Sequence, residues 1–366
     1  MITFNLFILF KLGLFSMKTL FYNLILLVFK KYNLFYFKKI KVYGLDNIPK
    51  SGGVIFSPNH QGAFLDPLIV GTTCGFKVTS LTRSDVFGGS FQWFLDALKM
   101  LPVYRIRDGF SSLKKNQETF DQCYELLANG KKMMMFPEGA HHNEYYLLRL
   151  SKGSSRLALE AQEKSKNSKV FLVPVGINYS HHQLPWQEVH VVYGKPIGVY
   201  EFLDSYQKNN VKATNSLRDD LEAGMKSCLW LPENDENYLE KKKYINLSNT
   251  KLGFPELKKK LALSTKELKI FDRKGTFIKF WIKLLSLPNL LPLFVLRKVL
   301  RFFPDIVFQN SVKYSMGLFI FIFWWFMLFF LGIYFYGVLD GIGLVMGSLI
   351  LLYLRQEFIS MYFCNE

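Results

Sequence analysis

Apolar and polar positions follow one another in different ways along the chain, and these differences divide it into four parts. The parts are residues 1–37, 38–200, 201–272 and 273–366. In the second part, apolar runs of strand length alternate with longer segments that have helical spacing. Strands alternating with helices predict an α/β domain in which helices flank a mostly parallel central sheet. The third part predicts a polar helical extension, because Leu217, Leu221 and Met225 recur at helical spacing.

The two ends of the chain have the composition of segments that meet lipid. Residues 1–37 mix Leu, Phe and Tyr with single lysines, which is typical of a helix lying in a membrane interface. Residues 314–338 are uncharged and long enough to span roughly 30 Å of hydrocarbon, whereas residues 341–354 are shorter and cross only with tilt or thinning. These two runs predict a C-terminal hydrophobic hairpin. Residues 277–303, which two prolines break, predict an interfacial or re-entrant segment.

The charge of the chain favours a membrane over a nucleic acid as its partner. With 46 Lys and Arg against 29 Asp and Glu, the formal net charge is +17, which favours an anionic partner. The apolar runs, and the lack of a nucleic-acid-binding motif in the sequence, favour a phospholipid membrane. Arg301, Lys313 and Arg355 flank the hairpin, so we expect it to enter and leave on the cytoplasmic side. Frequent Lys, Asn, Ile, Phe and Tyr are typical of AT-rich coding and suggest a low-GC bacterium, so we expect the membrane to be a bacterial inner membrane.

The segment with the clearest chemical content begins at an apolar strand and carries His60 and Asp66. The strand ends before Asn59 and His60, and a short loop leads to Asp66 and Pro67, which we expect to cap and open a helix. A carboxylate close to a histidine sets its tautomer and stabilises the imidazolium formed when it accepts a proton. The pattern predicts His60 as a general base that Asp66 orients. The alternative is a buried His–Asp pair with a purely structural role.

Further polar residues follow other predicted strands or open the next helix. They are Arg105, Arg107, Glu138, Gly139, Lys152 and Arg156. The two arginines at alternate positions share one face of a strand, where they either grip a phosphate or form a solvated edge. The Glu-Gly pair follows a buried strand, and open α/β sheets bind ligands at that end of their strands. The last two cations lie at a helix start, which suits an anion.

Four ordered blocks of residues carry a resemblance to a known family. They are Asn59-His60 through Asp66-Pro67, Tyr104-Arg105-Ile106-Arg107, Phe136-Pro137-Glu138-Gly139 and Val173-Pro174-Val175. Over residues 40–197 the chain resembles the glycerolipid acyltransferases, which include lysophosphatidic acid and glycerol-3-phosphate acyltransferases. The resemblance implies that His60 is the catalytic base and that Asp66 orients it. It also implies that Arg105 or Arg107, with Glu138 and Gly139, binds the phosphorylated acceptor, and that Pro174 shapes the acyl-donor side.

Two departures from the family pattern concern the acceptor. Five residues separate His60 from Asp66 where the usual spacing has four, which is similar to a minority branch that contains glycerol-3-phosphate-type enzymes. The chain also reads Pro-Glu-Gly-Ala-His where many members read Pro-Glu-Gly-Thr-Arg, so one phosphate-binding arginine is missing. His141, Lys152 or Arg156 could replace it.

The resemblance implies a membrane-bound O-acyltransferase of phospholipid synthesis. We expect it to move an acyl group from acyl-ACP or acyl-CoA to lysophosphatidic acid, with no metal and no cofactor besides that co-substrate. Glycerol-3-phosphate, another lysolipid or an aminolipid is the alternative acceptor. Two other classes stay open. One is a hydrolase whose metal ligands are His60, Asp66, Glu138, His141 and His142, and the other is a non-enzymatic membrane scaffold.

Overall fold

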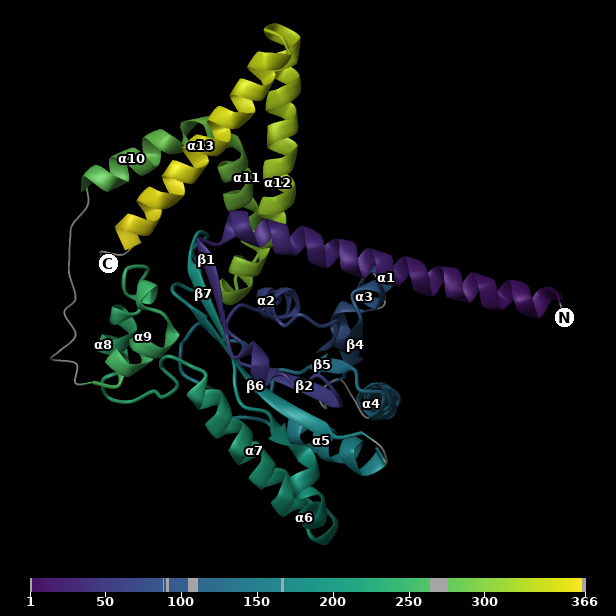
Figure 1. Cartoon of the computed structure of the whole chain (residues 1–366). Helices are drawn as coiled ribbons and strands as arrows, with labels where there is room; N and C mark the ends of the chain where they lie inside the picture. The colour runs from purple at the N-terminus through teal and green to yellow at the C-terminus, as the bar shows by residue number, and fades with distance from the viewer. Residues whose placement is uncertain are drawn as a thin grey trace.

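The computed structural model describes residues 2–87, 89, 92–104, 111–165, 168–263 and 276–363. Within them, the centre is an eight-stranded sheet with the order β1-β7-β6-β2-β5-β3-β4, in which β8 pairs with β6 (Figure 1). The strands are β1 Lys39–Tyr43, β2 Gly53–Pro58, β3 Val78–Arg83, β4 Met100–Val103, β5 Lys132–Met134, β6 Val170–Tyr179, β7 Glu188–Tyr193 and β8 Ile197–Gly198. Among the described strands, only the β6–β7 and β6–β8 pairs are antiparallel. The predicted mostly parallel sheet is therefore confirmed.

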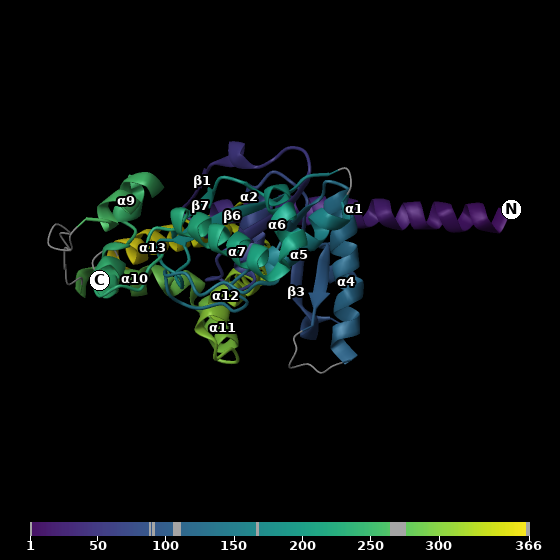
Figure 2. The ribbon, with the colours of Figure 1, turned by 90° about the horizontal axis from the view of Figure 1, so that it is seen from below.

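Helices cover both faces of the sheet. Those of the α/β part are α2 Leu65–Thr73, α3 Gln92–Ala97, α4 Ser111–Ala128, α5 Gly153–Lys164, α6 Leu203–Lys208 and α7 Asn210–Ser227. Along β2, Val54 and Phe56 enter a core that includes α2, whereas Ile55 enters the core of α4, α5 and α7. Seen from below, α5, α6 and α7 lie together over one face (Figure 2). This alternation explains why β2 is apolar at every position from Val54 to Phe56.

The polar segment after residue 200 contributes to the same core. Leu217, Leu221 and Met225 of α7 are completely buried against α4 and α5. The predicted amphipathic helix is thus present, and it packs as a layer of the α/β domain. The two following helices, α8 Tyr238–Tyr244 and α9 Phe254–Leu261, form a smaller core around Trp230.

The N-terminal segment is one long helix, α1 Ile2–Tyr36, of 35 residues or about 52 Å. Its second half is fixed to the α/β domain. Tyr22 Oη accepts a hydrogen bond from Val78 N at 3.1 Å, and Asn33 Nδ2 donates to Thr72 Oγ1 at 3.1 Å. The first half extends beyond the domain (Figure 1). Several large apolar side chains of α1 are exposed, namely Leu20, Leu24, Leu27, Leu34 and Phe35.

The C-terminal part forms four helices: α10 Thr276–Ser286, α11 Leu290–Leu300, α12 Ile306–Phe335 and α13 Val338–Phe363. Helices α12 and α13 make the predicted hairpin (Figure 1). The second run was predicted to be too short for a full span, but α13 has 26 residues, or about 39 Å. The helix continues past the predicted end because its polar residues find partners: Arg355 Nε donates to Ser286 Oγ at 2.8 Å, and Glu357 pairs with Lys38.

Three segments of the described residues are long and apolar enough to cross a membrane. They are Phe277–Leu300, Ile306–Phe335 and Val338–Tyr362. The first is interrupted by a turn at Leu287–Asn289, where the prolines predicted a break, so it consists of α10 and α11. Large apolar side chains stand exposed along α12, including Phe319, Phe323, Phe326 and Phe330. Contiguous exposed apolar surface of this kind is typical of a surface that faces lipid.

Both ends of the hairpin contact the α/β domain. Near the start, Ser311 Oγ donates to the carbonyl of Gly62 at 2.6 Å. Near the end, Glu357 accepts from Trp186 Nε1 at 2.8 Å and from Lys38 Nζ at 2.6 Å. The tip of the hairpin lies far from the sheet (Figure 1). A hairpin held in this way enters and leaves a membrane on the side where the domain lies.

Candidate active site

The site is built at the carboxyl end of β2, where the strand delivers Asn59 and His60. Asn59 continues the pairing of β2 with β6 through its side chain. Its Nδ2 donates to the carbonyl of Ile177 at 3.1 Å, and its Oδ1 accepts from the amide of Ile177 at 2.7 Å. Both backbone groups of one β6 residue are thereby satisfied by one amide, which fixes the backbone at the point where His60 leaves the sheet.

His60 and Asp66 form the predicted pair. His60 Nδ1 lies 2.8 Å from Asp66 Oδ2, and the carboxylate is fully buried. The same oxygen accepts from the amides of Gln61 at 2.9 Å and Gly62 at 2.8 Å, while Oδ1 accepts from Tyr179 Oη at 2.6 Å. Because an ionised carboxylate only accepts, His60 Nδ1 carries the hydrogen. Its Nε2 therefore keeps a free lone pair, as a general base requires.

Asp66 does not cap α2, contrary to the sequence prediction. The helix begins at Leu65 with Phe64 in the capping position, and no side chain caps it. Asp66 lies inside the first turn and turns its carboxylate back to the amides of the preceding loop. Two loop amides, Tyr179 and His60 give the carboxylate four hydrogen bonds, whereas a helix cap would give it about one. The carboxylate therefore stabilises the loop instead of capping α2.

The loop between His60 and Asp66 requires glycine at position 62 and is braced from the hairpin. A Cβ on Gly62 would lie 2.6 Å from Tyr179 Oη and 2.7 Å from Asp66 Oδ1, so no larger residue fits without displacing them. On the other side, Ser311 of α12 donates to the Gly62 carbonyl and accepts from Leu65 N at 3.1 Å. The five-residue spacing is thus stabilised by contacts on both sides.

The His60 ring lies between aromatic neighbours and solvent. The ring of Phe136 stacks on it with centroids 4.1 Å apart and planes inclined by 25°, and His141 meets it edge-on at 5.5 Å. The His60 side chain is 18% exposed, so the imidazole is reachable from outside. Burial, with the charge of Asp66, raises the pKa of Tyr179, which keeps its hydroxyl protonated as the donor to that carboxylate.

Glu138 holds the loop with both of its oxygens. Oε1 accepts from the amide of His60 at 2.7 Å. Oε2 accepts from Leu148 N at 3.0 Å and lies 3.1 Å from His142 Nε2. The side chain of Glu138 is fully buried. These contacts suit a positioning role, in which Glu138 sets the backbone of the residue that carries the imidazole. Its predicted role in binding the acceptor stays a prediction.

The other predicted residues are placed as follows. Gly139 has a φ of +70° and open space beside it, since a Cβ there would meet nothing within 4 Å. Lys152 and Arg156 are exposed at the start of α5, and Ser151 N donates to the Pro137 carbonyl at 2.8 Å, which brings this helix start beside the Glu138 loop. Arg105 and Arg107 lie outside the described residues.

Pro174 lies in the core of the domain. It pairs with Ser57 in the register of β6 and β2. Its ring packs against α7, because a Cβ on Gly224 would meet Pro174 Cγ at 2.7 Å. The structure thus places Pro174 between the sheet and α7, and its predicted place on the acyl-donor side stays a prediction.

Two histidines near the site have partners that sequence reasoning missed. His141 Nε2 lies 2.6 Å from Oδ2 of Asp305, the residue that caps α12. His182 is buried and its Nε2 lies 3.1 Å from Gln61 Oε1. Burial, reinforced by nearby positive groups, lowers the pKa of His182 to about 3, so the ring is neutral and donates to Gln61. His141 and His182 therefore contact the loop from His60 to Asp66 from outside it.

The residues considered as metal ligands are engaged in hydrogen bonds: His60 with Asp66, His142 with Glu138, and His141 with Asp305. In the described part of the chain, no three side chains of His, Cys, Asp or Glu converge on a point that would suit a metal ion. His60 instead donates to Asp66, and the carboxylate of Glu138 faces the amide of His60, the amide of Leu148 and His142. This geometry suits proton transfer at His60 Nε2.

Comparison with known proteins identifies the class to which this site belongs. Residues 39–178 match the family model described as Acyltransferase. This part of the chain, under half of its length, is thus similar to the acyltransferase family, in agreement with the four sequence blocks.

Individual relatives match shorter stretches. Glycerol-3-phosphate O-acyltransferase 1 of Saccharomyces cerevisiae is 28% identical over 143 residues, which cover 37% of this chain and 19% of that protein. Glycerol-3-phosphate O-acyltransferase 2 of the same yeast is 33% identical over 84 residues, 23% of this chain and 11% of that protein. The chain thus spans about a fifth or less of these relatives. The crystal structure of the 1-acyl-sn-glycerophosphate (LPA) acyltransferase PlsC from Thermotoga maritima has a TM-score of 0.40 and 20% identity, covering 56% of this chain and 80% of that one.

Proposed function

We propose that this protein is a membrane-bound O-acyltransferase that transfers a fatty acyl group from an acyl thioester to the free hydroxyl of lysophosphatidic acid. The observation that carries the proposal is the hydrogen bond of 2.8 Å between His60 Nδ1 and the buried Asp66 carboxylate. It leaves Nε2 as the proton acceptor on a partly exposed ring, inside a segment that is similar to the acyltransferase family.

The geometry supports a direct transfer. The acceptor hydroxyl loses its proton to His60 Nε2 as its oxygen attacks the thioester carbonyl carbon. The imidazolium that forms is stabilised by Asp66, which is already anionic and aligned by two amides and Tyr179. As the tetrahedral intermediate collapses, the new ester forms, the carbon–sulfur bond breaks, and the proton passes from Nε2 to the departing thiolate. General-base help of this kind is typically worth about 10²–10⁴ in rate.

We assign the acceptor phosphate to cations that the sequence blocks and the start of α5 provide. Arg105 and Arg107 keep that predicted role, together with Lys152 and Arg156 at the start of α5 and the open backbone at Gly139. Positioning by such contacts holds the hydroxyl within reach of Nε2. The acyl donor would be acyl-ACP or acyl-CoA, which is the only co-substrate that the mechanism needs.

A second acceptor, glycerol-3-phosphate, is favoured by specific observations. The two yeast relatives carry the name glycerol-3-phosphate O-acyltransferase. The five residues between His60 and Asp66 resemble the branch that contains enzymes of this type. The base and its aspartate are the same for both acceptors, so the distinction depends on how the rest of the acceptor is bound.

We place the catalytic domain on the cytoplasmic face of the membrane. Arg301, Lys313 and Arg355 lie toward the domain-side ends of the hairpin, where positive residues mark the cytoplasmic side. Helix α1 runs across the base of the hairpin, with exposed leucines that suit the membrane interface (Figure 1). In this arrangement the loop that carries His60 contacts α12 at Ser311, near the domain-side end of the hairpin, where we expect lysolipid headgroups.

The test is acyl transfer by membranes that carry the wild type, His60→Gln or the matched variant His181→Gln. Each is offered lysophosphatidic acid or glycerol-3-phosphate with labelled acyl-CoA or acyl-ACP. We expect transfer to lysophosphatidic acid that falls by about 10²-fold or more in His60→Gln and persists in His181→Gln. Transfer to glycerol-3-phosphate alone would select the second acceptor. Equal transfer by all three proteins would reject His60 as the base.

A further inference from the structure

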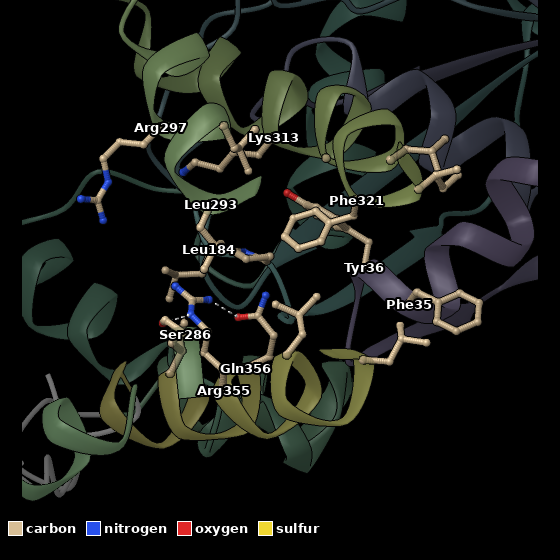
Figure 3. A pocket seen from close by; sticks show the side chains of 18 of the residues that line it. Phe35, Tyr36, Leu184, Ser286, Leu293, Arg297, Lys313, Phe321, Arg355 and Gln356 are labelled. Atoms are coloured by element: carbon tan, nitrogen blue, oxygen red, sulfur yellow. Dashed lines mark hydrogen bonds between the residues drawn. The ribbon is translucent and has the colours of Figure 1, made fainter. Parts of the chain in front are cut away.

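A large cavity lies outside the candidate active site, between α1 and the four C-terminal helices (Figure 3). Its volume is about 1210 Å³, above the roughly 300–1,000 Å³ of most small-molecule pockets. Its walls are mainly apolar and include Leu27, Tyr36, Leu293, Phe321, Leu352 and Ile359. No residue of the loop from His60 to Asp66 lines it. A molecule held here is therefore not in position to react at His60.

Six cationic residues line this mainly apolar space: Lys31, Lys279, Lys283, Arg297, Lys313 and Arg355. Two of them, Arg355 and Lys313, are held by hydrogen bonds to neighbouring groups. Figure 3 shows Arg355 of α13 and Lys313 of α12 directed toward the region around Leu184. Arg355 uses two of its five donors, Nε to Ser286 Oγ at 2.8 Å and Nη1 to Gln356 Oε1 at 3.3 Å. Lys313 Nζ donates to the Gln183 carbonyl at 2.9 Å. Donor groups of both cations therefore stay available to a ligand.

Neither cation has an anionic partner among the described residues, where no ion pair includes Arg355 or Lys313. Glu357, the acidic residue nearest to Arg355 along α13, instead accepts hydrogen bonds from Lys38 and Trp186. Both side chains are partly buried, and a cation that gives up hydration without gaining an anionic partner is destabilised. A ligand with a negative group would remove this destabilisation of Arg355 and Lys313, and a long apolar portion would fill the remaining cavity.

We propose that this cavity binds one anionic phospholipid, with its phosphate between Arg355 and Lys313 and its acyl chains along the apolar walls. A phosphate oxygen pair matches the forked donors of a guanidinium, and the ammonium of Lys313 adds a second charge. Both cations lie toward the domain-side ends of their helices, the depth at which headgroups lie if the hairpin spans the membrane. The bound lipid fills the space between α1 and the hairpin and joins them.

The site also adjoins the helix that braces the catalytic loop. Lys313 lies two residues beyond Ser311, which contacts Gly62 and Leu65. A phosphate bound by Lys313 would therefore lie close to the turn of α12 that contacts the loop through Ser311. The inference itself is independent of the proposed acyl transfer, because none of the groups that bind the lipid takes part in it.

The test uses the full chain, purified in dodecyl maltoside and stripped of lipid, with bound lipid counted by native mass spectrometry. The probe is dioleoylphosphatidylglycerol, which is neither substrate nor product of the proposed reaction. Dioleoylglycerol provides the chains without the phosphate, and inorganic phosphate provides the anion alone. We expect one phosphatidylglycerol per chain and at least tenfold weaker binding of the other two. Equal binding of dioleoylglycerol would overturn the proposal, and binding of inorganic phosphate alone would reduce it to an anion site.

Variants then locate the bound lipid. Arg355→Gln with Lys313→Gln should weaken binding at least tenfold, about 1.4 kcal/mol, whereas Arg301→Gln, an exposed arginine outside the cavity, should not. Leu293→Trp fills the cavity but keeps both cations, so it should also displace the lipid. The matched variant Leu291→Trp changes an exposed residue of the same helix that does not line the cavity.

The second pair keeps the test decisive if the charge variant fails to fold. Retention of phosphatidylglycerol in a folded Leu293→Trp protein, judged by gel filtration and circular dichroism, would overturn the proposal. The His60→Gln protein must bind the lipid as the wild type does, whatever its activity, so that a failure of acyl transfer does not count against the cavity.

Discussion

His141 Nε2 lies 2.6 Å from Asp305 Oδ2, and this contact joins the loop beside His60 to the first turn of the membrane hairpin. The other oxygen of Asp305 caps α12 through the amides of Val307 and Phe308. Burial opposes the charge of Asp305, but the hydrogen bonds from His141 and the two amides hold its pKa below the usual range. His141 stands where many family members carry arginine, so an anion on the hairpin orients the residue that replaces it.

Replacing Asp305 by asparagine tests this coupling. Asparagine caps a helix as well as aspartate does, so α12 should stay intact while His141 loses its anionic partner. Because the contact is partly exposed, we expect only about a two- to fivefold fall in kcat/KM. The measurement is acyl transfer by membranes, with Asp340→Asn at the tip of the hairpin as control. An unchanged rate would mean that the contact only holds the hairpin in place.

Glu138→Gln distinguishes a positioning role from binding of the acceptor. In this variant an NH₂ group replaces one of the two carboxylate oxygens. It faces either His60 N, or Leu148 N together with His142, so at least one hydrogen bond to a charged group is lost. Such bonds are worth about 1.5–3 kcal/mol, which corresponds to roughly a 10- to 100-fold loss of kcat if the loop shifts. We expect kcat to fall while the KM for the acceptor stays similar.

The kinetic readout decides between the two roles of Glu138. A variant with normal kcat and a strongly raised acceptor KM would support the role implied by the family resemblance. Glu233→Gln, which changes an exposed carboxylate, should alter neither constant.

Stability should fall in mild acid because of His182. In the folded protein the pKa of this buried histidine is about 3, whereas an unfolded histidine titrates near 6.5. Between these values the unfolded chain binds more protons, so the free energy of unfolding decreases as the pH falls below about 6.5. At pH 5 the loss is about 2 kcal/mol.

Urea unfolding at pH 7.5 and 5.0, in detergent, measures this loss. In His182→Gln, whose amide can still donate to Gln61, the difference between the two pH values should shrink by about 2 kcal/mol. An equal pH dependence in wild type and variant would show that His182 does not remain neutral in the folded state.

Local patterns in the sequence suffice for the sheet and for the central pair. Strand and helix lengths follow from periodicity over a few residues, and His60 and Asp66 belong to one short loop. The residues that contact this loop from other elements cannot be predicted from such local patterns. Tyr179 reaches Asp66 across 113 positions, and Ser311 reaches Gly62 across 249. Such contacts depend on how β6 and α12 pack, and no spacing along the chain encodes them.

Hydrogen bonds that form only in the folded chain explain the two corrected expectations. A carboxylate before a proline usually accepts hydrogen bonds from the first amides of a helix. In the folded loop, the amides of Gln61 and Gly62 donate to Asp66 instead. Likewise, polar residues at 355–357 signal the end of an apolar run, yet Ser286 and Lys38 provide partners that let α13 continue. At Asp66 the competing hydrogen bonds are themselves local, whereas at the end of α13 tertiary partners outweigh the local preference.

Gly62→Ala should be among the most damaging single changes in the chain. The added methyl group would lie 2.6 Å from Tyr179 Oη and 2.7 Å from Asp66 Oδ1, so it must push apart the two groups that hold the carboxylate. We expect about 1–3 kcal/mol of destabilisation, as for overpacked cores. Activity should fall by more than the unfolding accounts for, since Asp66 no longer aligns His60. Acyl transfer and urea unfolding of the same preparation separate the two effects.

A second substitution tests whether the damage arises from this clash. Tyr179→Phe removes the hydroxyl that the methyl group meets, so in the Gly62→Ala background it should recover part of the stability, although the contact with Asp66 Oδ1 stays. In the wild-type background the same change only removes one donor and should cost about 1 kcal/mol. Gly343→Ala, where a Cβ meets nothing within 4 Å, is the matched control. If the double variant is as unstable as the sum of the two single variants, the two positions are independent and the tight fit around Gly62 is not what maintains the loop.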